Sequence, residues 1–191
     1  MDLKKIIDKR RAYRSLEPVE ITENLVRDIA ECVRLAPSCF NNQPWRFVFV
    51  YEPRMLKKLK SALSSGNEWA TTASMIVAVF SKKELDCVSD GRDYYLFDTG
   101  MGTAYLILRA TDLGLVAHPI AGYDEGKVKS ILGIPGEMKV ITLVIVGKHS
   151  DKPGQLLSEK QAEVEKTRPE RMPVEKFIYI NRYSEKNSGK I

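Results

Sequence analysis

Residues 36–45 read APSCFNNQPW, and residues 45–51 continue as WRFVFVY. The first stretch holds two prolines, two asparagines, a glutamine and a tryptophan but no formal charge, although 29% of the chain is charged. The second stretch is aromatic and β-branched, which predicts a strand. A helix stop followed by a turn would by itself explain a neutral, amide-rich loop that leads into a strand. Whether the loop has a function therefore has to be judged from the elements and motifs on either side of it.

Two helices are predicted before this loop. Apolar residues recur at helical spacing in residues 3–10, which indicates a short first helix. Thr22 can cap a second helix, which Pro37 closes and whose apolar stripe consists of Leu25, Ile29 and Val33.

Helices and strands alternate after the loop. The longest element is a central helix within residues 91–114, in which apolar and aromatic residues recur every three or four positions. Gly100 and Gly102 cost this helix about 1 kcal/mol each, and we explain them by another backbone packing close to it. The other expected elements are a helix at 53–63, a loop at 64–69, strands at 75–80, 115–122 and 138–147, and a helix at 124–133 stopped by Gly133. The fold class is therefore α+β, with a few strands covered by helices.

The end of the chain is less regular. A polar segment at 149–170 links the strand at 138–147 to a last apolar element, VEKFIYI, at 174–180. Residues 184–191 are polar, and we expect them to form a frayed tail. With 191 residues in total, the chain suits a single domain over 1–183.

Composition favours a protein of the cytoplasm. No apolar run is long enough to span a bilayer, and the N-terminus is too charged for a secretory signal. Three cysteines without a CxxC spacing favour reduced thiols over a disulfide framework. The net charge of +5 comes from dispersed basic residues, so a broad nucleic-acid-binding face is not expected.

Side-chain catalysis lacks its usual parts in this sequence. The two histidines, His118 and His149, lie in different segments, and we interpret His118 as a structural residue. The chain has no HExxH, no GxSxG and no Cys/His cluster, so neither a catalytic metal nor a serine triad is expected. Nothing marks a base for Cys39, which we interpret as a bystander thiol. GMGTAY at 100–105 lacks the third glycine of a dinucleotide fingerprint. If the protein is an enzyme, a cofactor supplies the chemistry.

Several motifs taken in order resemble the nitroreductase family of FMN-dependent oxidoreductases. They are RRAYRSL, APSCFNNQPWRFVFV, DTGMGTAYLILRATDLGLVAHPIAGYD, LGIP and VITLVIVGK, and the resemblance runs from about residue 4 to residue 180. The APSxxNxQPW segment is the most specific of them. The resemblance implies a nitroreductase-like FMN-binding fold, with a central mixed β-sheet flanked by helices and a C-terminal arm that packs on a dimer partner.

The resemblance gives the amide-rich loop a ligand. A flavin ring has a polar edge of carbonyl and N–H groups, which neutral amides such as Asn41 and Gln43 can match, along with the ribityl hydroxyls. Prolines stiffen the loop backbone, so that Pro37, Ser38 and Cys39 can approach the cofactor closely. The variable position, Phe40, is our candidate for contacting the substrate. Trp45 is expected to anchor the loop in the core.

The resemblance also implies a phosphate site. The family's first motif, R-x-S-x-R/K, reads Arg10-Arg11-Ala12-Tyr13-Arg14 here, so that Ala12 lacks the usual hydroxyl. Arg10 and Arg11 then face the phosphate, and Arg14 lies nearer the ribityl chain and the O2 edge. Near the C-terminus RPERMP brings Arg171 to the phosphate, while Pro169 stands where the family has a basic residue. Whether Arg168 replaces that residue stays open.

The turn HPIAG at 118–122 corresponds to the family's redox-tuning position. By resemblance, the backbone N–H groups of Ala121 and Gly122 point at flavin N5, and Pro119 and Ile120 pack on one face of the ring. Asn67 matches an asparagine that some relatives use on the pyrimidine edge.

The resemblance implies an enzyme in which NAD(P)H passes hydride to flavin N5 and a nitro compound, quinone or similar acceptor then takes the electrons, in a ping-pong cycle. It also implies a homodimer with FMN at the subunit interface. The apolar 176–183 segment, KFIYINRY, suits an arm on the partner, and core packing explains it equally well. Three alternatives stay open: a dehalogenase or flavin-processing enzyme of the same fold, a flavin-binding module with little turnover, and a nucleic-acid-binding N-terminus.

Overall fold

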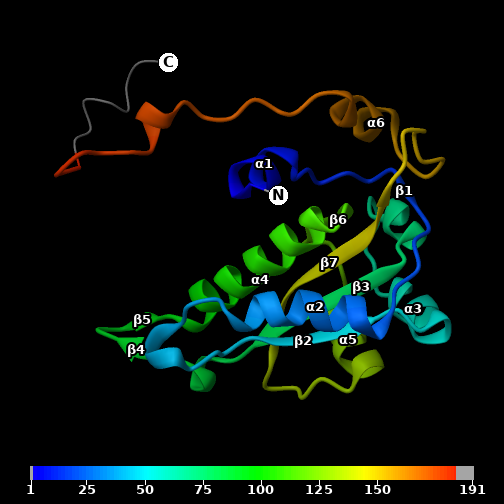
Figure 1. Cartoon of the computed structure of the whole chain (residues 1–191). Helices are drawn as coiled ribbons and strands as arrows, with labels where there is room; N and C mark the ends of the chain where they lie inside the picture. The colour runs from blue at the N-terminus through cyan, green and yellow to red at the C-terminus, as the bar shows by residue number, and fades with distance from the viewer. Residues whose placement is uncertain (1, 184–191) are drawn as a thin grey trace.

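The protein is built around a five-stranded sheet (Figure 1), as seen in a computed structural model that describes residues 2–183. The strand order is β1 (Leu16–Glu17), β7 (Lys139–His149), β3 (Met75–Ser81) and β2 (Arg46–Val50), and β6 (Leu115–Ile120) also pairs with β7. The α+β class and the central sheet are confirmed. All of these strand pairs are antiparallel, instead of the mixture of directions that we expected. The predicted tail, 184–191, lies outside the described residues.

Helices cover both faces of the sheet, so its central strands are buried on both sides. Alternate residues of β3 enter opposite cores, with Ile76 on one side and Val77 on the other. The Val77 side is covered by α2 (Glu23–Arg34) and α4 (Tyr95–Asp112). The Ile76 side is covered by α3 (Pro53–Lys60) and α5 (Glu125–Leu132). A continuous apolar run such as 75–80 is typical of this position.

Several helix boundaries follow the signals in the sequence. The Thr22 hydroxyl accepts the Leu25 N–H at the start of α2, as predicted. Gly133 ends α5 with a left-handed backbone, φ 66°, which an L-residue adopts only with strain. The first helix, α1 (Leu3–Lys9), lies within the expected 3–10.

The central helix begins later than the 91 that we expected. Val88–Ser89 (β4) and Arg92–Asp93 (β5) form a small hairpin, and Asp90 and Gly91 between them have φ values of 49° and 76°. An Asp-Gly pair is the usual signal for such a turn, and the helical periodicity that follows it hid this signal.

The close neighbour of the helix glycines is a side chain, which corrects our expectation of a backbone. A Cβ on Gly102 would lie 3.2 Å from ring atoms of Trp45, whereas one on Gly100 would meet no other part of the described chain within 4 Å. Trp45 is buried, as predicted, and packs in the same core as Leu106 of α4. The tryptophan at the end of the amide-rich loop therefore fastens that loop to α4.

Two further elements were not predicted. Leu16–Glu17 pairs with the end of β7, and α6 (Glu159–Lys166) lies within the polar segment at 149–170. The side chains of Ser158 and Gln161 cap the first turn of α6 reciprocally, and this S-x-x-Q pattern is the signal that could have revealed it. Short 3₁₀ turns complete the fold: η1 (Cys39–Asn41), η2 (Glu68–Thr72), η3 (Lys83–Leu85) and η4 (Val174–Lys176).

The chain after α6 runs along one side of the molecule as an extended segment (Figure 1). Its apolar side chains are exposed, with Phe177 at 58% and Ile180 at 82%. Core packing of 176–183, one of our two interpretations, is therefore wrong for the single chain. We call residues 167–183 the C-terminal arm.

The expectation of reduced thiols is wrong for two of the three cysteines. Cys39 and Cys87 form a disulfide across 48 residues, with their Cα atoms 6.1 Å apart, while Cys32 is a free thiol. Only the fold brings the pair together, so sequence spacing could not reveal it. No helix among the described residues combines the length and apolar character that a bilayer crossing needs.

Candidate functional site

Arginines from both ends of the chain line one cavity of about 160 Å³. Arg10, Arg11 and Arg14 come from the segment between α1 and β1, and Arg168 and Arg171 from the arm. The remaining lining residues are Ala12, Val164, Glu165 and Pro169. The cavity is smaller than the roughly 300–1,000 Å³ typical of ligand pockets, so it suits one end of a ligand.

The positive charge in this cavity is poorly compensated. Within residues 2–183 none of the five arginines forms an ion pair with a carboxylate. Burial, followed by repulsion from Arg168, Arg171 and Arg11, lowers the pKa of Arg10 from its ordinary value. Such a concentration of guanidinium groups suits a phosphate dianion.

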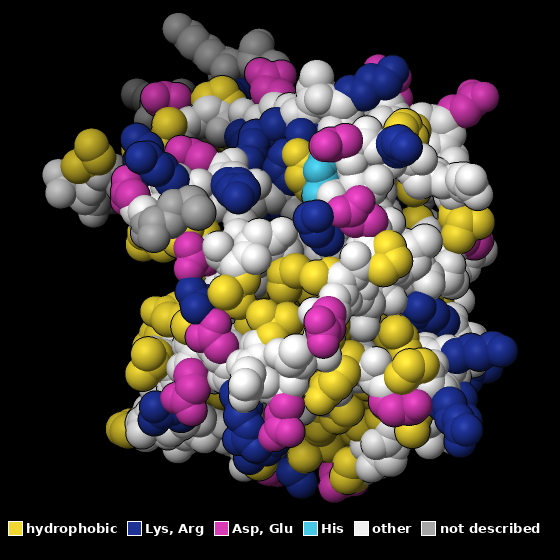
Figure 2. Space-filling view, turned by 45° about the vertical axis from the view of Figure 1, so that its right-hand side comes forward, with side chains coloured by type: hydrophobic (Ala, Val, Ile, Leu, Met, Phe, Trp, Pro, Cys, Tyr) yellow, Lys and Arg dark blue, Asp and Glu magenta, His cyan; other side chains and the backbone are white. Residues whose placement is uncertain are grey.

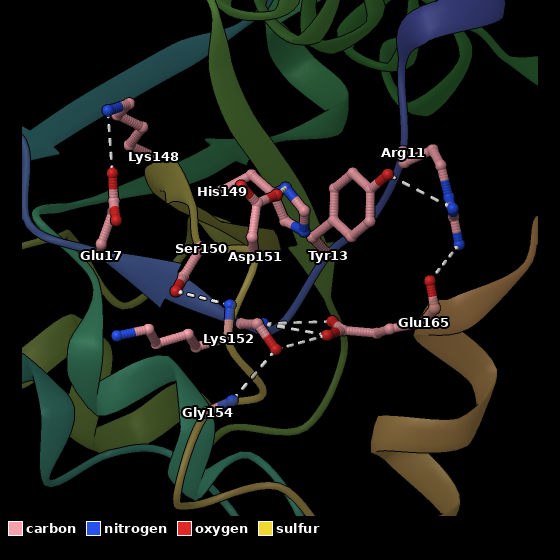
Figure 3. A network of polar contacts seen from close by, with 11 residues as sticks. Arg11, Tyr13, Glu17, Lys148, His149, Ser150, Asp151, Lys152, Gly154 and Glu165 are labelled. Carbon is pink, nitrogen blue, oxygen red and sulfur yellow. Dashed lines mark hydrogen bonds and ion pairs between the residues drawn. The ribbon is translucent and has the colours of Figure 1, made fainter.

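A hydrogen-bond network fixes the cavity walls (Figure 3). The Arg11 guanidinium donates to the backbone carbonyls of Glu165 at 2.9 Å and Thr167 at 2.7 Å. The Glu165 carboxylate accepts the backbone N–H groups of Arg14 and Ser15 and the Ser15 hydroxyl. Because these bonds commit the carboxylate to the backbone, Glu165 orders the cavity without pairing with its arginines.

Aromatic contacts connect the cavity to the turn at 118–122. The Arg14 guanidinium lies 5.8 Å from the ring centre of the buried Trp69, whose indole stacks on the His118 ring at 4.7 Å. His118 is 8% exposed, and its Nδ1 donates to the Tyr13 carbonyl at 3.1 Å. Burial above all lowers the pKa of His118 to about 4. His118 is therefore a neutral structural residue, as we predicted.

The structure brings Asn67 and the 119–122 turn together. The Asn67 amide donates to the Gly122 carbonyl at 3.0 Å, and a Cβ on Gly122 would overlap that amide. Pro119 and Ala121 are exposed, and Ile120 is buried at the end of β6. We call Arg10, Arg11, Ala12, Arg14, Asn67, 119–122 and Arg171 the arginine half-site.

The amide-rich loop has an unusual backbone. Phe40, Asn41 and Gln43 have φ values of 46°, 58° and 48°, a left-handed region that non-glycine residues rarely adopt. The Gln43 amide bonds the Asn41 side chain at 3.2 Å, and Phe40 is 90% exposed. We call residues 37–43 the amide half-site.

The two half-sites lie at opposite ends of α4 in one chain (Figure 1). Cys39 donates its backbone N–H to Asp98 in the first turn of α4, at 2.6 Å. Arg11 shares a cavity with Thr111, near the C-terminal end of the same helix. Asp98 and Thr111 are thirteen residues apart, which is about 20 Å along a helix. The structure therefore does not bring all the predicted residues into one place.

Two larger surface grooves, of about 650 and 740 Å³, lie elsewhere on the molecule. Both are lined mainly by apolar residues and include Ile21, Tyr51 and Pro53. Neither gathers the arginines or the amides, so volume alone does not identify the site.

Residues that support the half-sites escaped the sequence analysis. Glu165 and Trp69 hold the arginine half-site, and Asp98 and Cys87 hold the amide half-site. Each lies far in sequence from its partner and carries no local motif. The one available signal was the carboxylate of Asp98 within a helix whose other buried residues are uncharged.

Comparisons with known proteins agree on one family. Residues 7–148 match the family model described as the nitroreductase family. A Bacillus subtilis protein with an NAD(P)H nitroreductase name is 28% identical over 78% of this chain and 90% of its own length. A Thermus thermophilus protein named NADH dehydrogenase is also 28% identical, over 77% of this chain and 86% of its own. A crystal structure described as an oxidoreductase containing FMN matches with a TM-score of 0.82 and 26% identity, covering 94% of this chain and 91% of the other.

Proposed function

This chain belongs to the nitroreductase family of oxidoreductases, and from that membership we propose that it uses FMN to pass electrons from NAD(P)H to electron-poor acceptors. Nitro compounds, quinones and similar conjugated molecules are the acceptors we propose. The FMN in the similar oxidoreductase structure and the NAD(P)H in the name of the Bacillus subtilis relative support the choice of cofactor and donor.

One observation carries this proposal: five arginines line a small cavity, and no carboxylate of residues 2–183 pairs with them. Arg10, Arg11 and Arg171 would hold the FMN phosphate through charge-assisted hydrogen bonds. Arg168 also lines the cavity, which supports it as the replacement for the basic residue missing at Pro169. Ala12 leaves room but offers no hydroxyl.

When bound, FMN supplies the redox chemistry, accepting hydride at N5 from NAD(P)H and releasing electrons to the acceptor in two half-reactions. Arg14 would lie near the ribityl chain and the O2 edge, where its charge favours added negative charge. The backbone N–H groups of Ala121 and Gly122 would donate toward N5, with Pro119 and Ile120 against the ring. Asn67 would fix the turn, since its amide already bonds Gly122.

The amide half-site would complete the cofactor's surroundings. Asn41 and Gln43 provide neutral donors and acceptors, and Pro37, Ser38 and Cys39 provide a backbone that can approach closely. Phe40 is our candidate for contacting the acceptor, because its side chain is 90% exposed.

A homodimer is part of this proposal. One FMN can meet both half-sites only if the amide half-site comes from a second copy of the chain, because α4 separates them within one chain. The exposed apolar arm supports the same arrangement. Figure 2 shows apolar side chains gathered on one face beside basic ones. Each copy would contribute the single unit of residues 1–183, and we keep the cytoplasmic location that the composition favours.

An absorbance spectrum of the purified protein, followed by anaerobic addition of NADH or NADPH, tests the function. We expect a flavin band that bleaches on addition of one donor and returns when nitroaromatics or quinones are added. A colourless protein that gains no flavin band with FMN would contradict the proposal. A band that bleaches but returns only with halogenated aromatics would favour the dehalogenase alternative, and a band that never bleaches would favour the flavin-binding module.

A further inference from the structure

The amide half-site holds a backbone that would not persist alone. Phe40 and Gln43 adopt left-handed φ values of 46° and 48°, which side chains other than asparagine and aspartate rarely tolerate. Such conformations survive where the surroundings hold the chain at several points. The contacts that hold this loop therefore decide whether the half-site exists.

Several hydrogen bonds hold the loop. The Cys39 N–H donates to Asp98, the Gln43 N–H donates to the Ser38 hydroxyl at 2.9 Å, and the Ser81 hydroxyl donates to the Pro44 carbonyl at 2.9 Å. The bond between Ser38 and Gln43 is internal to the loop. The bonds at Cys39 and Pro44 tie it to the rest of the molecule, and the buried Trp45 fastens its end. The Asn42 amide also donates to the Asp86 carboxylate at 3.3 Å, and the Arg46 guanidinium donates to the Gln43 carbonyl at 3.0 Å.

A further tie is covalent. Cys39, next to Phe40, is joined to Cys87, which lies just before the exposed β4–β5 hairpin. Both cysteines are partly exposed, so a reductant in solution can reach the bond. The disulfide and the Asp98 contact act on the same residue, and they hold the first half of the loop from two sides.

We propose that Cys39–Cys87 is a reversible thiol–disulfide site through which a dithiol reductant controls the amide half-site, and hence FMN binding. This inference rests on the proposed function. In the reaction a dithiol attacks, the Cys39–Cys87 S–S bond breaks, and each Sγ gains a proton from the dithiol. The reductant becomes a disulfide, so two electrons and two protons pass from it to the protein.

The proposed cytoplasmic location is consistent with a Cys39–Cys87 disulfide that opens in response to a reductant. Disulfides in the cytoplasm are usually transient, catalytic or redox-sensing. Once the bond opens, the hydrogen bonds from Cys39 to Asp98 and from Asn42 to Asp86 remain, and Phe40 between them can leave its strained conformation. The loop then populates conformations that do not present Asn41 and Gln43 to a cofactor, and FMN binding weakens.

The experiment begins by counting thiols in the intact dimer. Maleimide labelling without reductant should modify Cys32 alone, and a dithiol reductant should raise the count from one label to three. A chelator is included, because ligand atoms of Cys39, Cys87 and Asp86 lie within 4.8 Å of one another and the reduced form could take up a metal ion.

Two readouts follow on the same samples. Hydrogen exchange of the FMN-free protein should accelerate over residues 36–43 after reduction, and the Kd for FMN should rise about tenfold. The Cys87→Ser variant should behave as the reduced protein in both conditions. The Cys32→Ser variant is the matched control and should respond to reductant as the unmodified chain does. Circular dichroism checks that each variant is folded.

The outcomes separate the two proposals. Unchanged exchange and unchanged FMN affinity after mass-confirmed reduction would overturn the thiol–disulfide site, as would a protein that shows three thiols under all oxidising conditions. A protein that binds no FMN in either state would overturn the proposed function. Faster exchange over 36–43 on reduction would in that case still support the reversible tie on the loop.

Discussion

At the scale of single residues, the main evidence for a ligand site is a group of arginines that form no ion pair with a described carboxylate. Arg10 loses proton affinity because it is partly buried and is surrounded by other guanidinium groups. In contrast, Arg109 has carboxylates on both sides, at Asp28 and Asp112, and the hydrogen bonds that it donates to Asp28 raise its pKa. Arg109 thus forms structural ion pairs, whereas Arg10 and its neighbours suit an anionic ligand.

Replacing Arg10 and Arg171 together with alanine should weaken FMN binding by at least about a hundredfold. Hydrogen bonds to charged groups contribute about 1.5–3 kcal/mol each, and about 1.4 kcal/mol corresponds to a factor of ten. Fluorescence titration measures the affinity, with riboflavin as the comparison ligand, because it lacks the phosphate and should lose little. Arg27→Ala, which removes an exposed ion pair with Glu23, is the control. Equal losses for FMN and riboflavin would contradict the phosphate assignment.

His118 makes stability depend on pH in a defined window. Its pKa is about 4 in the folded protein, against 6.5 as its ordinary value, so the unfolded chain binds the extra proton between these values. Stability should therefore fall as the pH drops from about 6.5 to about 4, by about 3 kcal/mol in total.

Urea unfolding of the unmodified chain and of His118→Asn measures this effect. Asparagine offers an N–H that can still donate to the Tyr13 carbonyl but has no proton to gain. The difference in stability between the two proteins should shrink toward pH 4. A constant difference across this range would show that His118 does not titrate on unfolding.

At the scale of elements, α4 organises the molecule. Its first turn holds the amide half-site through Asp98, its middle accepts Trp45 at Gly102, and its last turn lies near Arg11. The two glycines of this helix differ in their surroundings, which makes them a matched pair.

Gly100→Ala should stabilise the protein by up to about 1 kcal/mol, because alanine favours a helix and the added Cβ would lie more than 4 Å from the other elements among residues 2–183. Gly102→Ala should show no such gain, because its Cβ would lie 3.2 Å from the Trp45 ring. Urea unfolding at a single protein concentration compares the two. Equal stabilisation by both variants would mean that Trp45 moves aside freely.

The elements also show how far sequence reasoning reaches. Periodicity and caps located α2, α5 and β3 within a few residues, because those signals are local. Long-range pairing left no trace in the sequence, as in β1 and the Cys39–Cys87 disulfide. Family motifs identified candidate site residues, but they could not reveal that α4 separates the two groups. Whether each of those residues contacts FMN stays a prediction.

At the scale of the whole molecule, a single chain is incomplete. It exposes an apolar arm after α6 and holds its half-sites apart. The arm also supplies Arg168 and Arg171, so its position affects both the proposed interface and the phosphate site. Assembly and cofactor binding should therefore be coupled.

Replacing Phe177 and Ile180 with serine should weaken the dimer at least about a hundredfold, since burial of each apolar side chain contributes roughly 1.5–3 kcal/mol. Sedimentation velocity measures dissociation, and the same samples should lose FMN as they dissociate. Leu156→Ser, at an apolar side chain that is 48% exposed outside the arm, should leave the dimer intact. A double variant that stays dimeric would exclude the arm from the interface.

Because α4 separates the two half-sites, a defect in one half-site should be complemented by a chain whose defect lies in the other. A chain defective only in its arginines and a chain defective only in its amide loop would each form inactive homodimers. In a mixed dimer one site would combine both defects, while the other would combine two intact halves. Random pairing of equal amounts would thus restore about a quarter of the sites. Two inactive alleles in one cell could then rescue each other, whereas two alleles damaged in the same half could not.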